Sequence, residues 1–462
     1  MINLSSIPIN VTGKIISVLG AGRSGIAIAQ LLAQNGADVL LSDSRQITFT
    51  APQKQKLHSL NIKTEFGEHS KSILQSDLVV ISPGIPATAP IVQQIEAAEI
   101  PIVSEIEAAY WFMPDAGLIA VTGSNGKTTT TTLIYEIFKD SQYDAYCGGN
   151  IGIPFSSLIP QAVKDAEKPK VFILEMSSFQ LERIIHFHPD VAIILNVTDD
   201  HMDRYDHDLN LYLKAKLNIS KNQTAKDLFI YFSDDSLLSS NVPLLPQKRP
   251  FGLNDNPGMQ VKTDMVSIMT KDGQEYLNLK NIKLLGEHNL LNILATLNVT
   301  QHFNISKDRV IEVLKDFSGI EHRLEYIRTI NGIDYFNDSK ATNVESVKYA
   351  LKSFSRPVII ILGGRDKDSD FSILLPYLKE HVKHVLLIGE AASKIESVVR
   401  NILDYSYADS MESAVNDATH IAQAGDVVLL APACASFDMF ENYEHRGRVF
   451  KEIVLSITED RK

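Results

Sequence analysis

A glycine-bounded turn that carries a lysine and threonines is the strongest chemical signal in the sequence. It is Gly123-Ser124-Asn125-Gly126-Lys127-Thr128-Thr129, between an apolar run at 118–122 and a threonine-rich helical segment. In this context backbone N–H groups face an anion, Lys127 neutralises phosphate charge and the Thr128 hydroxyl can ligate Mg²⁺. Val121 stands where the usual motif has its first glycine. The pattern predicts an ATP-binding loop, and the alternative is a plain strand-to-helix turn.

Polar residues follow two further apolar runs. Glu175 ends the run at 171–174, and the segment from Asn196 through His201 to Asp203 follows the run at 191–195. The carboxyl ends of parallel strands meet at one edge of a sheet, where such folds bind ligands. Carboxylate oxygens with one imidazole suit Mg²⁺ or Mn²⁺ better than zinc. We therefore expect Glu175 and His201 beside the phosphate loop, with most of the neighbouring acidic residues in a solvated loop.

A second glycine-rich turn follows the first apolar run of the chain. It is Gly20-Ala21-Gly22-Arg23-Ser24-Gly25, with Asp43 further on. This spacing matches the dinucleotide fingerprint G-x-G-x-x-G, and by itself it indicates NAD. Simple packing of a helix on a strand would also explain the glycines.

The elements that must position these residues alternate between short runs of Val, Ile and Leu and amphipathic stretches, as in parallel α/β sheets. This pattern returns after residue 330, and between about 226 and 286 alternating segments indicate added antiparallel strands. We predict an α/β chain of three domains. These are a Rossmann-like N-terminal domain at 1–105, a P-loop-type ATPase domain with antiparallel strands at 106–318, and a Rossmann-like C-terminal domain at 319–462.

Composition excludes several classes of protein. The 44 basic and 56 acidic residues give a net charge of -12, which disfavours general binding to nucleic acid or to an anionic membrane. Cys147 and Cys434 have no metal-type spacing, and no apolar run is long enough to span a bilayer. We expect a monomer in the cytoplasm, without nucleic-acid partners or membrane insertion.

Several motifs together resemble the Mur ligases and folylpolyglutamate synthetases. They are 122–130, Gly148-Gly149-Asn150-Ile151-Gly152, 175–181 and 196–203. The motifs 337–343, Leu362-Gly363-Gly364 and 432–438 are most similar to the Mur ligases that add D-glutamate. The resemblance runs over essentially the whole chain. It implies a UDP-substrate domain, a central ATPase domain, and a C-terminal domain that binds D-glutamate and closes over ATP.

The resemblance also implies ATP contacts, with two Mg²⁺ ions and Mn²⁺ as a substitute. The ATP contacts are Gly123, Ser124, Asn125, Gly126, Lys127, Thr128, Thr129, Asn289, Asn292, Arg323, Asp338 and Lys340. Without it, Asn289 is as well explained as a helix cap. The implied metal ligands are Thr128, Glu175, His201 and a carbamylated Lys216, which the sequence alone places on a helix surface. An ammonium group cannot ligate Mg²⁺, whereas a carbamate offers two oxygens.

The implied small-molecule partners are UDP-N-acetylmuramoyl-L-alanine and D-glutamate. Contacts to the first are Ser24, Asp43, Arg45, Ser82, Gly84, Asn150, Ser177, Gln180 and His201, so the first glycine turn would hold UDP rather than NAD. Contacts to D-glutamate are Thr342, Lys367, Ser436 and Tyr443. Tyr443 stands where the family has phenylalanine, and its hydroxyl changes the expected pocket.

The expected chemistry is activation of a carboxylate as an acyl phosphate, followed by attack of an amine. Lys127 and Arg323 would spread the transferred charge, with Glu175, His201 and Lys216 completing the catalytic set. His201 or a nearby carboxylate could accept the amine proton. Three alternatives stay open: another Mur ligase or a folylpolyglutamate synthetase, an NAD-dependent oxidoreductase, and an inactive nucleotide-binding regulator.

Overall fold

The computed structural model describes residues 10–164, 168–254, 259–262, 265–270, 273–279, 282, 284, 286–317, 319–366 and 368–458. These residues form two compact units. One unit holds the described residues up to Asn278 together with Leu291–Val313, and the other holds those of Leu279–Leu290 and those from Leu314 onward. The chain passes from one unit to the other between residues 278 and 279, between 290 and 291 and between 313 and 314.

The first sheet has the strand order β3-β2-β1-β4-β5, and every pairing recorded in it is parallel. Apart from the short polar edge strand β3, its strands are rich in Val, Ile and Leu and are largely buried, as helices on both faces of a parallel sheet require. The elements are β1 (Ile15–Leu19), α1 (Arg23–Gln34), β2 (Asp38–Asp43), α2 (Ala51–Ser59), β3 (Lys63–Phe66), η2 (Lys71–Gln75), β4 (Leu78–Ile81), α3 (Pro90–Ala97), β5 (Ile102–Ser104) and α4 (Glu105–Tyr110).

The second sheet lies in the same unit and has the order β11-β10-β9-β6-β8-β7, again parallel. Strand β6, which leads into the phosphate loop, therefore pairs with β8 on one side and β9 on the other. The elements up to the antiparallel strands are β6 (Gly117–Thr122), α5 (Lys127–Lys139), β7 (Asp144–Gly149), α6 (Phe155–Lys164), β8 (Lys170–Glu175), α7 (Ser178–Leu181), β9 (Val191–Ile194), η3 (Met202–Tyr205), α8 (Leu209–Leu217), η4 (Asn218–Ser220), β10 (Leu228–Phe232), α9 (Ser236–Ser239) and β11 (Gln247–Phe251).

The predicted antiparallel strands form a sheet of their own. Strands β12 (Met259–Lys262), β13 (Met265–Thr270) and β14 (Gly273–Asn278) pair in that order. Helices α10 (Glu287–His302) and α11 (Lys307–Asp316) follow. Asn289 is the third residue of α10, so its interpretation as a helix cap is wrong.

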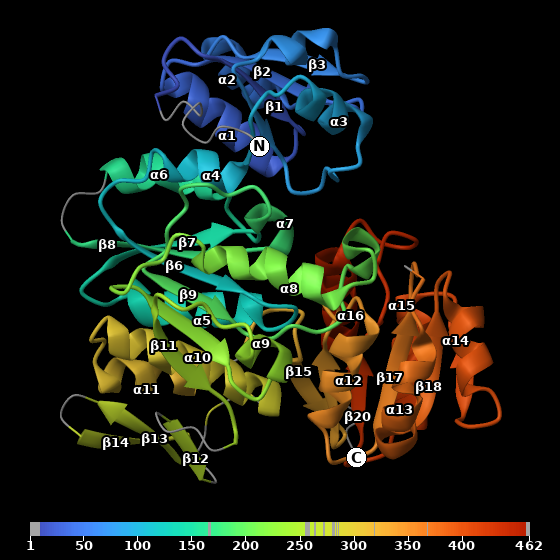
Figure 1. The fold of residues 1–462 in the computed structure, drawn as a ribbon. Helices are drawn as coiled ribbons and strands as arrows, with labels where there is room; N and C mark the ends of the chain where they lie inside the picture. Colours follow the sequence, from blue (N-terminus) through green and yellow to red (C-terminus); the bar gives the residue numbers. More distant parts are fainter. Residues whose placement is uncertain are drawn as a thin grey trace. The chain divides into compact units, whose positions relative to one another are not determined.

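The sheet of the second unit has the order β15-β16-β20-β17-β18-β19, with β15 antiparallel and the rest parallel. Figure 1 shows the sheets with helices beside them. The elements are β15 (Glu325–Ile330), β16 (Ile333–Asn337), α12 (Val344–Lys352), β17 (Val358–Gly363), η5 (Phe371–Leu374), α13 (Leu375–His381), β18 (Val382–Ile388), α14 (Ala392–Val399), β19 (Tyr405–Tyr407), α15 (Met411–Ile421), β20 (Val427–Leu430) and α16 (Tyr443–Ser456).

The predicted fold class is confirmed, with three parallel or mostly parallel sheets and a separate antiparallel one. The domain boundaries near 105 and 318 stay predictions, and residue 318 lies outside the described residues. Among the helices that the structure describes, none combines the length and the apolar character that crossing a bilayer requires.

Candidate active site

The phosphate loop connects β6 to the N-terminus of α5. Gly126 caps the helix with a φ of 85°, and Gly123 has a φ of 153°, so both adopt backbone conformations that favour glycine. A Cβ on Gly126 would lie 2.4 Å from Asn292 Oδ1. The Lys127 Nζ donates to the carbonyl oxygens of Gly123 and Ser124 at 2.8 Å each. The loop therefore curls around its own lysine at the start of a 13-residue helix, an arrangement suited to an anion.

Asn196, two residues after the end of β9, holds this loop in place. Its Oδ1 accepts from the Asn125 N–H at 2.8 Å, and its Nδ2 donates to Asn125 O at 3.1 Å. The Ser124 N–H donates to Asn196 O at 3.0 Å. The sequence placed Asn196 in the metal segment and did not indicate this role, because an amide that bonds to a distant loop leaves no pattern in the chain.

Glu175 lies at the end of β8, paired in register with Val121 of β6. Its side chain is 1% exposed, and its Oε1 accepts from Asn150 Nδ2 at 2.9 Å. Its Oε2 is buried and has no hydrogen-bond partner among the described residues. A buried carboxylate oxygen without a donor is costly, and a cation would satisfy it. The pairing of β8 with β6 places Glu175 beside the strand that leads into the phosphate loop, as expected.

Lys216 is buried, which corrects its placement on a helix surface. It is 1% exposed on α8, and its Nζ lies 4.1 Å from the centre of the Tyr212 ring. Burial, reinforced by the positive charge of Lys127, lowers the pKa of Lys216 well below its usual value, while Asp200 acts in the opposite direction. The side chain therefore favours the neutral amine, and its electrostatic partners place it beside the phosphate loop.

His201 follows the segment from Asn196 and has a φ of 55°. Its Nε2 lies 3.8 Å from Asp200 Oδ2, and its ring packs edge-on against Phe179 with centroids 4.9 Å apart. The side chain is 49% exposed, so the imidazole can reach a ligand. Asp199 is exposed, as expected for a solvated loop.

A cavity of about 770 Å³ opens at the carboxyl ends of the first sheet. The two glycine-containing turns at Gly20 and Ser82 and the end of β2 form its walls. Eight residues of the fingerprint turn and the UDP prediction line it: Gly20, Gly22, Arg23, Ser24, Asp43, Arg45, Ser82 and Gly84. Their contact with a uridine diphosphate stays a prediction, and the cavity is the size of a small-molecule site.

Asp43 and Arg45 form a fixed pair in this cavity. The Arg45 Nε and Nη2 donate to the two carboxylate oxygens of Asp43 at 3.1 and 3.0 Å, and the Ala21 N–H donates at 2.9 Å. The hydrogen bond from Arg45 lowers the pKa of Asp43 more than its burial raises it. Asp43 therefore stays ionised and orients the guanidinium along the cavity wall.

We expect Asp43→Asn to destabilise the protein by about 1 to 2 kcal/mol at pH 7, because an amide cannot accept all of these bonds. The folded-state pKa of Asp43 is depressed, so its contribution is present above about pH 4 and is lost as the pH falls towards the folded pKa. Thermal unfolding of both proteins between pH 3 and pH 7 measures the difference. The matched control is Asp38→Asn, which removes an exposed pair with Lys63. Equal effects of the two substitutions would contradict the prediction.

His69 also lines the cavity and was missed from the sequence. The Ser42 hydroxyl donates to Glu65 Oε1 at 2.7 Å and lies 2.7 Å from His69 Nδ1. Since the single Ser42 hydroxyl proton goes to Glu65, the Ser42 oxygen accepts from His69 Nδ1. Little in the sequence points to His69 as a cavity residue, because β3, which precedes it, is short and polar and does not resemble a buried strand.

The residues expected at the sugar-peptide end lie near Glu175. Ser177 and Gln180 form a capping box on α7, in which the Ser177 N–H donates to Gln180 Oε1 at 2.9 Å. Gln180 is 1% exposed. Their local role is therefore to begin α7, and direct contact with a substrate stays a prediction.

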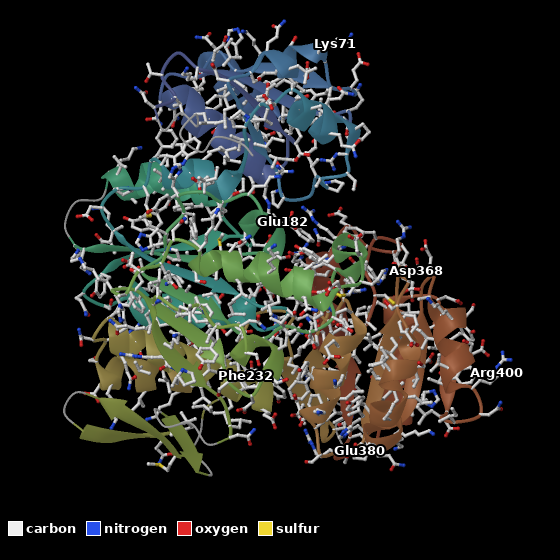
Figure 2. The ribbon with its side chains drawn as sticks, viewed as in Figure 1. Lys71, Glu182, Phe232, Asp368, Glu380 and Arg400 are labelled. Carbon is white, nitrogen blue, oxygen red and sulfur yellow. The ribbon has the colours of Figure 1, made fainter. Side chains whose placement is uncertain are left out.

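Arg204 connects the Pro83 turn of the cavity with the segment after His201. Its Nη1 donates to Pro83 O at 3.2 Å, and its Nη2 donates to Glu182 Oε2 at 2.7 Å. Glu182, labelled in Figure 2, follows α7. The guanidinium carbon lies 4.0 Å from the centre of the Phe179 ring, which also contacts His201. Arg204 thus joins the cavity to the His201 side of the unit.

In the second unit, Asn289 and Arg323 line a cavity of about 540 Å³ with Leu284, Phe336 and Phe354. Asp338 is 5% exposed, and burial raises its pKa to about 6 although Arg323 and Lys340 act against the shift. Asp338 therefore interacts with both cations, and the contact of these three residues with ATP stays a prediction. Asn292 belongs to the other unit, where its Oδ1 accepts from Thr130 Oγ1 at 3.2 Å.

Two of the residues expected to bind D-glutamate, Thr342 and Ser436, lie on loops of the same unit. Thr342 follows Lys340, and Ser436 is 2% exposed after β20. Tyr443 begins α16, and Lys340 Nζ lies 5.8 Å from its ring centre. Lys367 lies outside the described residues.

Three family models match the chain. They are "Mur ligase MurD-like, N-terminal domain" at 14–104, "Mur ligase middle domain" at 121–300 and "Mur ligase, glutamate ligase domain" at 322–434. The chain belongs to the Mur ligase family.

Similar proteins extend this finding over the full length. UDP-N-acetylmuramoylalanine--D-glutamate ligase of Chloroherpeton thalassium is 39% identical over 97% of this chain and 99% of that protein. The enzyme of the same name from Salinibacter ruber is 40% identical over 95% and 97%. The solved structure of UDP-N-acetylmuramate-alanine ligase MurC from Thermotoga maritima has a TM-score of 0.59 and 21% identity, over 96% of this chain and 99% of that one. The last similarity shows a shared fold.

Proposed function

We propose that this chain is an ATP-dependent ligase that joins D-glutamate to UDP-N-acetylmuramoyl-L-alanine in the synthesis of peptidoglycan precursors. The observation that carries the proposal is the full-length similarity to two D-glutamate ligases. The geometry supports it, because one unit contains the phosphate loop, the ionised Asp43 in the wall of the cavity and the buried amine of Lys216. The enzyme works as a monomer in the cytoplasm.

Substrate binding follows the order of the chain. The cavity with Ser24, Asp43 and Arg45 holds the UDP group, and the first domain spans 1–105. The central domain, at 106–318, binds ATP through Lys127. The C-terminal domain, at 319–462, binds D-glutamate through Thr342, Lys367, Ser436 and Tyr443 and closes over ATP.

The donors near the phosphate loop fit Mg²⁺, since the unpartnered oxygen of Glu175 is a hard ligand. Thr128, Glu175, His201 and a carbamylated Lys216 would hold two ions, with Mn²⁺ as a substitute. Bound there, the metal would neutralise phosphate charge. The neutral amine that burial favours is the form of Lys216 able to add CO₂, and this supports the carbamate.

In the proposed reaction the L-alanyl carboxylate attacks the γ-phosphorus of ATP and forms an acyl phosphate with release of ADP. Lys127 and Arg323 stabilise the charge of the transferred group. The amine of D-glutamate then attacks the acyl carbon, loses a proton and expels phosphate. The chain's own contribution is to hold the reactants in line and to keep water from the acyl phosphate.

The direct test is phosphate release from ATP, measured with each substrate alone and with both. We expect release only when UDP-N-acetylmuramoyl-L-alanine and D-glutamate are both present. The same assay with L-glutamate or meso-diaminopimelate in place of D-glutamate separates this function from those of other Mur ligases and of folylpolyglutamate synthetases. Release without either substrate, or binding of NADH in the Asp43 cavity, would overturn the proposal.

A further inference from the structure

Arg446 is buried inside the second unit, and the functions assigned above do not use it. It lies in the first turns of α16 and is 2% exposed. All hydrogen bonds recorded for its guanidinium among the described residues go to uncharged oxygen atoms. A buried cation held by neutral groups is costly, so its presence calls for a specific task.

Those oxygens belong to two loops that follow neighbouring parallel strands, β16 and β20. On the first loop, Nε donates to Ser339 Oγ at 3.0 Å and Nη2 donates to Ser339 O at 2.8 Å. On the second loop, Nη1 and Nη2 both donate to Cys434 O at 3.1 Å, and Nη1 donates to Ala435 O at 3.4 Å. One planar side chain therefore joins both loops.

The two loops carry different substrate residues. Ser339 lies between Asp338 and Lys340, which the resemblance to the Mur ligases assigns to ATP. Ala435 directly precedes Ser436, which the proposed function assigns to D-glutamate. The Ala433 N–H also donates to Ala341 O at 2.9 Å, so the loops are in direct contact. A shift of Arg446 would displace residues of both sites together.

A third loop makes room for this arginine. Gly364, after β17, has a φ of 133°, and a Cβ there would lie 2.4 Å from Ala435 O and 3.2 Å from Arg446 Nη1. The Leu362-Gly363-Gly364 motif is thus explained in part by the space that Arg446 and the second loop occupy. Burial lowers the pKa of Arg446 to about 10, so the side chain keeps its charge at pH 7.

We propose that Arg446 is a positioning residue that holds the nucleotide loop (338–341) and the amino-acid loop (432–436) in one arrangement, so that the binding of ATP and the binding of D-glutamate depend on it together. This inference rests on the proposed function. Two features distinguish this role from general packing. The guanidinium donors of Arg446 form a fork that lysine cannot reproduce. Their acceptors all belong to these two loops and not to the rest of the core.

The test compares Arg446→Met, Arg446→Lys and the control Arg448→Met, which changes an exposed arginine on the same helix. KM for ATP and KM for D-glutamate should each rise about tenfold or more in both Arg446 variants. KM for UDP-N-acetylmuramoyl-L-alanine should stay within about twofold of wild type, because its cavity lies in the other unit. Circular dichroism and thermal unfolding identify the folded variants, and if the methionine variant does not fold, the lysine variant decides.

The proposal is overturned if a folded Arg446 variant keeps wild-type KM values, if only one of the two KM values changes, or if Arg446→Lys restores both. If wild-type protein does not ligate D-glutamate, the proposed function fails by itself. Calorimetric binding of a non-hydrolysable ATP analogue then tests Arg446 separately. Weaker binding by a folded variant supports the nucleotide half of the proposal, and unchanged binding overturns it.

Discussion

Replacing Lys127 with methionine is expected to lower kcat for phosphate release about 10²- to 10³-fold, the usual effect of removing one charged donor from a transition state. Methionine retains the length and apolar stem of lysine, so α5 should still form. The Lys127 Nζ contacts two carbonyl oxygens of the loop at 2.8 Å, which places the charge inside the turn that would surround the phosphates. Steady-state phosphate release with both substrates present measures the effect.

The matched control is Lys139→Met, at the far end of the same helix, where the side chain is 50% exposed. It removes the same charge from α5 without touching the phosphate loop, and we expect kcat close to that of wild type. A folded Lys127→Met protein with kcat within about threefold of wild type would contradict a role in phosphoryl transfer.

Replacing Lys216 with methionine is expected to cause a loss of similar size, about 10²- to 10³-fold in kcat. The reason differs, because the proposed carbamate supplies oxygens that methionine lacks. Wild-type activity should also fall in buffer stripped of CO₂ and return when bicarbonate is added, since a carbamate forms from the neutral amine that burial favours. Phosphate release before and after addition of bicarbonate measures both effects.

Lys214→Met is the control for this second experiment, because Lys214 lies on the same helix and is exposed. It should keep its activity and the wild-type response to bicarbonate. If Lys216→Met is inactive while wild type ignores bicarbonate, the amine itself matters and the carbamate is rejected. If Lys216→Met is active, Lys216 has no role in the reaction.

Much of the fold was predictable because parallel strands buried on both faces form continuous apolar runs. The predicted runs at 15–19 and 118–122 became β1 and β6 with little or no shift in their ends. The predicted alternation at 265–269 became β13, in a separate antiparallel sheet. Short polar strands such as β3 were missed, since the edge of a sheet needs no apolar run.

The candidate site was likewise predictable from the sequence only in part. Gly126 and Lys127 were found because the turn between a strand and a helix imposes local requirements on glycine and on charge. The burial of Lys216 was not predicted from the residues alone, because the sequence of α8 does not show which distant segments pack against the helix. Asn289 was open to interpretation as a cap, and the structure places it inside α10.

The sequence by itself determined the class of fold, the phosphate loop and the resemblance to the Mur ligases, because each depends on residues close together in the chain or on motifs in a fixed order. Only the tertiary structure decided which distant groups share an environment. The bonds of Asn196 to the phosphate loop, the burial of Lys216 and the hold of Arg446 on two loops all join residues far apart in sequence. Their energies depend on distance and burial, which a linear chain does not specify.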